Sequence, residues 1–176
     1  MQQNVVSFEE LFGRAKHSAV HLEMRDSYAV SGEAADVARW KETGEVNADP
    51  NSDYWRTWVV AVSGAVERGV RVRRARIVSQ PVADYIRFEY AITPVNLAAG
   101  EEVRWLVRRN ASDIALPGND FWLFDGTFVR LNHFTGNGDG ADEPFEDTED
   151  PGLAQLCATA FEAVWERATP HAEFAL

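Results

Sequence analysis

Cysteine is almost absent from this chain: Cys157 is the single one among 176 residues. Small secreted domains usually carry an even set of cysteines joined in disulfides, so a single cysteine favours a reducing compartment. No apolar run of signal-peptide type follows Met1, and no stretch approaches the ~18 apolar residues that a membrane span requires. We therefore expect a soluble, cytoplasmic protein in which Cys157 is a small buried hydrophobe on a helix rather than a catalytic thiol.

Lysine is scarce as well, since Lys16 and Lys41 are the only two, and the net charge at pH 7 is −11. So acidic a molecule repels polyanions at long range, which argues against direct binding to nucleic acid or to a membrane. Much of the negative charge comes from residues 136–150, which hold seven acidic residues and no basic one. We expect residues 135–151 to form an acidic, mobile loop.

The length and the hydrophobic pattern predict one α+β domain over residues 1–176, with a central mixed β-sheet flanked by helices. Apolar residues at three- and four-residue spacing, with capping signals, predict helices at 7–16, 33–43, 52–68, 81–93 and 153–168. Period-two or continuous apolar runs predict strands at 20–25, 70–78, 102–107, 121–124 and 127–134. Asp125-Gly126 is a strong signal for the hairpin between the last two strands.

The strand at 70–78 has two possible patterns. Val70 and Val72 share one parity, whereas Ala75 and Ile77 share the other. A β-bulge near Arg73-Arg74 would bring all four side chains to one face. A strand that is buried on both faces explains the same residues without a bulge, and both alternatives stay open.

Motifs for catalysis are missing. The chain has no Gly-x-Ser-x-Gly elbow, no P-loop and no Gly-x-Gly-x-x-Gly between a strand and a helix, so we lean against an enzyme and expect no cofactor. The segment from Thr135 resembles a calcium-binding loop, with Asn137, Asp139 and Glu146 as weak candidate ligands. Thr135 replaces the first aspartate and a strand precedes it, so we expect no metal there.

Arginines are the remaining candidates for a site. If Arg73, Arg76, Arg87 and Arg104 converge at one end of the sheet, their planar guanidinium groups could bind a phosphate or carboxylate ligand. Asp84 or Glu89 could instead neutralise them in intramolecular pairs. The tryptophans are expected in the core rather than as a ligand platform.

Several motifs carry a resemblance to a known family. They are Phe8-Glu-Glu-Leu-Phe, His17-Ser-Ala-Val-His-Leu-Glu, the run from Gly69 to Glu89, Gly100-Glu-Glu-Val-Arg-Trp-Leu, Pro117-Gly-Asn-Asp-Phe-Trp-Leu-Phe-Asp and Thr169-Pro-His. Together they resemble a family of actinobacterial proteins that is defined only by a domain of unknown function and is often encoded beside helix-turn-helix regulators. The resemblance implies a DNA-binding regulator as a partner but no activity. The chain departs from the family at residues 136–150.

The order of elements also resembles half of a phospholipase D-like domain. The chemistry of that superfamily needs a His-x-Lys pair, in which the histidine is the nucleophile and the lysine binds phosphate. The four histidines here are each followed two residues later by another residue type: Ala19, Glu23, Thr135 and Glu173. The resemblance therefore implies a degenerate domain that at most senses or binds a ligand.

Our leading functional hypothesis is a non-catalytic regulatory or protein-interaction module that works with a helix-turn-helix transcriptional regulator. The alternative is an enzyme or sensor that binds a small phosphorylated or nucleotide ligand at the arginine cluster. A third hypothesis is DNA mimicry by the acidic segment, which requires ordered carboxylates at phosphate-like spacing. The sequence does not indicate an oligomeric state.

Overall fold

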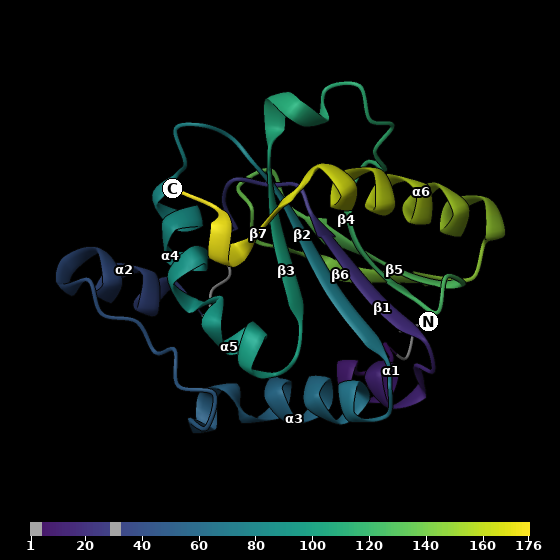
Figure 1. Ribbon diagram of the computed structural model, residues 1–176, viewed down its shortest axis with the longest axis horizontal. Coiled ribbons are helices and arrows are strands. Elements are labelled where there is room, and N and C mark those ends of the chain that lie inside the picture. Colours follow the sequence, from purple (N-terminus) through teal and green to yellow (C-terminus); the bar gives the residue numbers. More distant parts are fainter. Residues whose placement is uncertain (1–4, 29–32) are drawn as a thin grey trace.

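The computed structural model describes residues 5–28 and 33–176. It contains one seven-stranded sheet with the strand order β6-β5-β4-β1-β2-β3-β7 (Figure 1). The strands are β1 (Ser18–Glu23), β2 (Arg71–Val78), β3 (Glu102–Val107), β4 (Asp120–Phe124), β5 (Phe128–Phe134), β6 (Gly140–Thr148) and β7 (Thr169–Pro170). The helices are α1 (Phe8–Arg14), α2 (Ala34–Thr43), α3 (Asp53–Glu67), α4 (Asp84–Ile92), α5 (Pro94–Ala98) and α6 (Pro151–Arg167). The predicted α+β fold with a mixed sheet is confirmed.

The sheet is mixed because its centre is parallel and its flanks are antiparallel. β2 pairs in parallel with both β1 and β3. β4, β5 and β6 add antiparallel strands beyond β1, and β7 pairs antiparallel with β3. Helical connections lead from β1 to β2 and from β2 to β3, as parallel neighbours require.

Helices cover both faces of the sheet (Figure 1). On one face α6 packs Phe161 and Val164 against Val20, Leu22 and their neighbours in the sheet. On the other face α1 and α3 cover Ala19, Val72 and Trp122, and α4 covers the sheet around Trp105. Successive residues of each strand alternate between these two cores, as the period of a strand dictates.

The β2 strand runs without a bulge. Its register is continuous with β1 from Arg71 to Arg76 and with β3 from Arg73 to Val78. Every residue of β2 after Arg71 is buried, so the alternative of a strand covered on both faces is correct. Both parities can be apolar because helices lie over both faces.

The acidic segment corrects our expectation of a loop over 135–151. Residues 140–148 form the edge strand β6, in register with β5 from Val129 to Asn132. Phe145 packs on Phe8, and Asp147 pairs with Arg130, so alternate residues of this strand have partners. Charged side chains and a proline are typical of an edge strand, which explains why the composition resembles a loop.

The predicted glycine after the third helix and the predicted Asp-Gly hairpin turn are both confirmed. Gly69 follows α3 with φ 92°, and Asp125 and Gly126 form the hairpin turn with φ 51° and 71°. The helix predicted from Pro81 begins three residues later, at Asp84, and a separate short helix, α5, begins at Pro94.

Cys157 is buried in α6. Burial raises the pKa of its thiol to about 11, in agreement with a structural role. Among residues 5–28 and 33–176, none of the helices is both long and apolar enough to cross a membrane.

Candidate functional site

A cavity of about 260 Å³ lies where the parallel strands β1 and β2 end, on the face covered by α3, α4 and α5. Ligands of open sheets with helical crossovers commonly bind at the carboxyl ends of the strands, where loops diverge. We call this cavity the central pocket. Its lining consists of His21, Glu23, Tyr28, Glu33, Trp55, Trp58, Arg74, Arg76, Tyr85, Glu89, Ile92, Asn96, Asn132 and Phe134.

The register of β1 and β2 brings the charged residues of the central pocket together. His21 lies opposite Arg74, and Glu23 lies opposite Arg76. On the pocket face of β1, Ala19 belongs to the apolar core, whereas the next two residues on that face, His21 and Glu23, line the pocket. They form its polar wall. Because cross-strand neighbours on one face are close, pairing of opposite charges follows directly from the register.

A buried network of ion pairs forms this wall. Arg74 donates from Nε to Glu101 Oε1 at 2.7 Å and from Nη1 to Glu23 Oε1 at 2.8 Å. Arg76 donates to the other oxygen of Glu23 and to Glu89, and its Nη1 lies 2.8 Å from Thr93 Oγ1.

The network fixes the ionisation of its members. Burial opposes the charge on Glu23, but the charges of Arg76 and then Arg74 outweigh burial and hold its pKa well below its usual value. Burial likewise opposes the charge on Arg76, and the Glu23 and Glu89 carboxylates reverse that effect and raise its pKa. Glu23 and Arg76 therefore both stay charged at physiological pH.

His21 lies between the network and the aromatic core. Its ring stacks on Trp122 with 4.3 Å between centroids. Nδ1 lies 2.8 Å from the carbonyl oxygen of Phe121, and Nε2 lies 3.3 Å from Glu23 Oε1. Contacts at both ring nitrogens hold the imidazole in one orientation.

Two tyrosines, Tyr85 of α4 and Tyr28 of the segment after β1, line the pocket and bind carboxylates. The Tyr85 hydroxyl of α4 lies 2.8 Å from Glu33 Oε2, and the Tyr28 hydroxyl donates to Asp120. Burial and then nearby carboxylates raise the pKa of both phenols. Burial, followed by the charge of Glu89, raises the pKa of Glu33 to about 6.

Two polar atoms of the lining are buried without a hydrogen-bond partner in the described part of the chain. They are Trp58 Nε1, from α3, and Asn132 Oδ1, from β5. A buried donor or acceptor without a partner costs about 1–3 kcal/mol, and water or a ligand can satisfy it. Both side chains line the pocket, although neighbouring protein atoms cover these two polar atoms.

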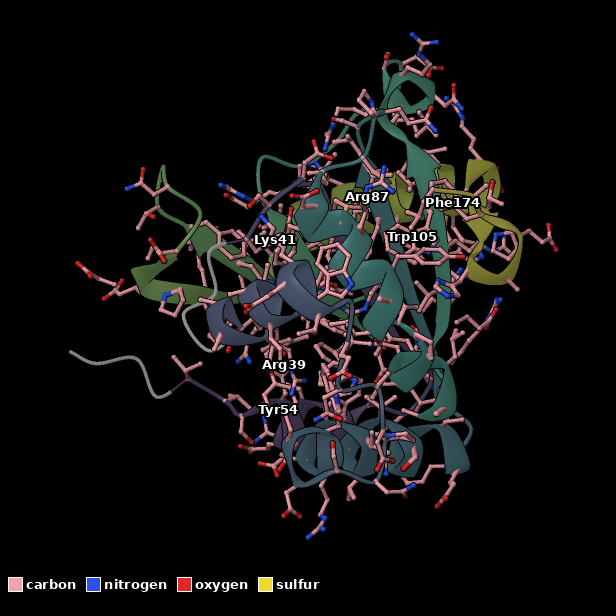
Figure 2. The ribbon with its side chains drawn as sticks, turned by 90° about the vertical axis from the view of Figure 1, so that its left-hand side faces the viewer. Arg39, Lys41, Tyr54, Arg87, Trp105 and Phe174 are labelled. Atoms are coloured by element: carbon pink, nitrogen blue, oxygen red, sulfur yellow. The ribbon has the colours of Figure 1, made fainter. Side chains whose placement is uncertain are left out.

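The four predicted arginines do not converge, which corrects the hypothesis of one anion site built from all of them. Arg73 pairs with Glu162 of α6, and Arg104 donates to the Trp165 carbonyl oxygen at 3.1 Å; both guanidinium groups contact the Trp165 ring. Arg76 lies on the opposite face, in the central pocket. Arg87 is exposed on α4 (Figure 2).

Strand geometry explains this separation. Residues three apart in a strand point to opposite faces, so Arg73 and Arg76 cannot share a site. The predicted neutralisation by Glu89 is confirmed at Arg76, whereas Asp84 pairs with Lys41 instead. The sequence reasoning missed Arg74, Glu23 and Glu101. The alternation of polar residues in β1 and β2 could have indicated Glu23 and Arg74, whereas Glu101 precedes β3 and has no such signal.

The candidate calcium ligands are also separated. Asn137 and Asp139 lie in the turn between β5 and β6, whereas Glu146 lies within β6 and contacts His133 Nε2 at 2.9 Å. Within residues 5–28 and 33–176, no three His, Cys, Asp or Glu side chains are grouped as a metal site requires. Tryptophans divide between core and pocket: Trp105 and Trp122 are buried, and Trp55 and Trp58 line the cavity.

One of the comparisons with known proteins, that with Nuc, supports the fold. A search of curated proteins finds no match to this sequence. Nuc from Salmonella typhimurium, a member of the phospholipase D family, is similar in structure with a TM-score of 0.52 and 13% identity, over 93% of this chain and 87% of Nuc. The archaeal chromatin protein TrmBL2 matches with a TM-score of 0.46 and 13% identity, over 92% of this chain and 48% of that protein. A family model matches residues 6–176, and the chain therefore belongs to the family described as a domain of unknown function (DUF6879).

Proposed function

We propose that this protein is a non-catalytic regulatory module that binds a small molecule in the central pocket and acts through a protein partner. The observation that carries the proposal is the pocket itself: a cavity of about 260 Å³ whose wall is held by buried ion pairs and whose lining contains two unpartnered polar atoms. Convergent polar groups in a cavity that is already formed are typical of small-molecule sites.

The protonation states of three side chains in the pocket favour binding over catalysis. A general base works best with a pKa near the operating pH, and a nucleophile needs an accessible deprotonated form. The pKa of Glu23 is lowered and the pKa values of Tyr28 and Tyr85 are raised, so all three move away from that optimum. Glu33, with a pKa of about 6, is the exception, and its Oε2 is already bound to the Tyr85 hydroxyl at 2.8 Å. Each of these side chains is also held by hydrogen bonds that orient it for recognition.

A phosphorylated or nucleotide ligand is the second candidate because Arg74 and Arg76 line the cavity. Both guanidinium groups are already bound to carboxylates, so an anion would have to displace Glu23 or Glu89 from them. This competition makes the second candidate the weaker one.

The partner that we propose to test first is a helix-turn-helix transcriptional regulator, as the sequence resemblance implies. The acidic surface fits a protein partner better than nucleic acid or a membrane. The module would then work in the cytoplasm, beside the regulator. Co-purification with the neighbouring regulator, with and without a bound ligand, tests this part of the proposal.

A thermal-shift screen followed by calorimetry tests the pocket. Small cations, neutral compounds and anions, including inorganic phosphate and AMP, are screened for an increase in Tm, because a ligand that binds only the folded state stabilises it. The Trp58→Phe and Asn132→Ala variants should lower the affinity of every hit. Val60→Ala is the control, since Val60 is 65% exposed and lies outside the lining. Hits that bind all variants equally, or an absence of hits, would refute the proposal.

A further inference from the structure

The charges around the central pocket do not balance. The carboxylates of Glu23, Glu89 and Glu101 each form an ion pair with Arg74 or Arg76. In contrast, Glu33 and Asp120 take hydrogen bonds from tyrosines and, in the described part of the chain, form no ion pair. Asp120 is only 3% exposed, whereas Glu33 lines the cavity. The unmatched charge therefore faces the pocket at Glu33.

Aromatic rings form much of the remaining wall. Tyr28 and Tyr85 approach each other with 5.7 Å between centroids, and Trp55, Trp58 and Phe134 complete the lining. The faces of such rings attract cations. Two of these rings already receive a guanidinium group of this chain: Arg74 lies 5.6 Å from the Trp58 centroid, and Arg25 lies 5.1 Å from that of Phe134.

A second cavity adjoins the same residues. It has about 350 Å³ and shares Tyr28, Glu33 and Tyr85 with the central pocket. Its other wall comes from α2 and includes Ala34, Val37, Ala38 and Lys41. Lys41, on α2 (Figure 2), is 3.3 Å from Asp84 of α4, so its charge is already matched. Glu33 thus lines both the central pocket, which is polar, and the second cavity, which is more apolar.

We propose that the ligand is a small organic cation that carries an ammonium or guanidinium group at Glu33 and an apolar or aromatic body along α2. This inference rests on the proposed function and specifies its ligand class. The N–H donors of the cation bind Glu33, while the rings of Tyr28 and Tyr85 contact its charge. An anion at the same place meets the carboxylate of Glu33, which repels it and has no ion-pair partner among the described residues.

Three compounds of one shape and different charge test the inference by isothermal titration calorimetry at pH 7.5. Tyramine carries an ammonium group, tyrosol carries a hydroxyl in its place, and 4-hydroxyphenylacetate carries a carboxylate. We expect tyramine to bind about ten-fold tighter than tyrosol or more, and the carboxylate not to bind. Equal binding of tyramine and tyrosol, tighter binding of the carboxylate, or no binding of tyramine would overturn the inference.

A matched pair of variants locates the charge. Glu33→Gln keeps an acceptor for the Tyr85 hydroxyl but removes the charge, so it should weaken tyramine about ten-fold and leave tyrosol unchanged. Glu102→Gln is the control, because Glu102 pairs with Arg71 outside the pocket. Circular dichroism confirms that both variants fold. Equal loss of tyramine binding in both variants, or none in Glu33→Gln, would count against the site.

The experiments distinguish a failure of the cation inference from a failure of the proposed small-molecule function. If inorganic phosphate or AMP binds in a manner that depends on Trp58 and Asn132 while tyramine does not bind, the cation inference is wrong and the proposed function stands. If no compound binds in a manner that depends on these two residues, both fail.

Discussion

Arg76 shows how one residue can hold several elements together. Its guanidinium group joins β2 to Glu23 of β1 and to Glu89 of α4, with 5% of the side chain exposed. Arg71, five residues earlier on the same strand, pairs with Glu102 while 55% of its side chain is exposed. The two arginines provide a matched comparison of a buried and a surface ion pair.

We predict that Arg76→Met lowers the free energy of unfolding by about 3–5 kcal/mol, because it leaves the charge of Glu89 buried without an ion-pair partner and Glu23 with Arg74 alone. Arg71→Met should cost less than about 1 kcal/mol, since water already screens that pair. Urea denaturation of both variants measures the difference. Similar losses in the two variants would show that burial adds nothing to this pair.

Glu33 should give the stability an unusual pH dependence. Its pKa is raised from 4.5 to about 6 by burial and then by the charge of Glu89, with Tyr85, Glu23 and Arg76 as its other charged or hydrogen-bonded neighbours. A carboxyl group with a raised pKa binds protons more strongly in the folded protein. Its contribution to stability is therefore complete below pH 4.5 and is lost as the pH rises through 6.

We predict that Glu33→Gln is more stable than the parent protein by roughly 1–2 kcal/mol at pH 7 and that this difference disappears near pH 4. Glu102→Gln should instead be less stable than the parent protein at pH 7, because a hydrogen bond from Arg71 lowers the pKa of Glu102 and the variant loses that stabilisation. Chemical denaturation from pH 4 to 7.5 compares the two variants. A pH-independent difference for Glu33→Gln would contradict the raised pKa.

At the scale of elements, the β4–β5 turn does more than reverse the chain. Asp125 accepts hydrogen bonds from the backbone amides of His17 at 2.7 Å and Ser18 at 3.0 Å, just where β1 begins. Burial opposes its ionisation, but these amides and that of Lys16 outweigh burial and lower its pKa. The turn therefore fixes the first residues of the strand that carries His21 and Glu23.

We predict that Asp125→Ala costs about 2 kcal/mol of stability, because the residue loses these acceptors and has φ 51°, a conformation that alanine disfavours. Asp125→Asn should cost less, since asparagine tolerates this backbone and keeps one acceptor oxygen. Thermal unfolding of both variants provides the measurement. Equal losses in the two variants would mean that the charge, which both remove, dominates over conformation.

The sequence predicted the elements whose signals are local. The helix that became α3 has regular apolar spacing and a glycine with φ 92° after it, and the hairpin has Asp125-Gly126. The edge strand β6 was missed because Phe8, which packs on Phe145, is distant in sequence, and because the strand itself is rich in carboxylates. In β2 the apolar residues at both odd and even positions fitted either a β-bulge or a strand that is covered on both faces. The helices on both faces of the sheet decide for the second alternative.

The candidate site was harder to predict than the fold. The central pocket joins Glu23 of β1, Arg76 of β2 and Glu89 of α4, and only the strand register shows that they meet. The arginine-rich run suggested a site, but its alternate residues face opposite sides of the sheet. Neither free polar atom, Trp58 Nε1 or Asn132 Oδ1, has any signal in the sequence.

At the scale of the whole molecule, the sheet has a protected centre and an exposed edge. β1 and β2 are flanked by strands on both sides, whereas β6 pairs only with β5 and has no fully buried residue. We predict that the amides of β1 and β2 exchange with deuterium only on global unfolding and that those of β6 exchange through local opening. Hydrogen exchange with mass spectrometry tests this. Equal protection of β6 and β1 would contradict it and also our expectation of mobility for residues 135–151.

The buried charge network also constrains how this protein can change over generations. Glu101, Arg74, Glu23, Arg76 and Glu89 alternate in one chain of buried ion pairs, with three carboxylates and two guanidinium groups. The loss of either arginine leaves Glu101 or Glu89 buried without an ion-pair partner, even where a fully apolar replacement of the group would be tolerated. Descendants of this chain should therefore keep both arginines, and a lineage that abandons one should be found to have abandoned the carboxylate that depends on it as well.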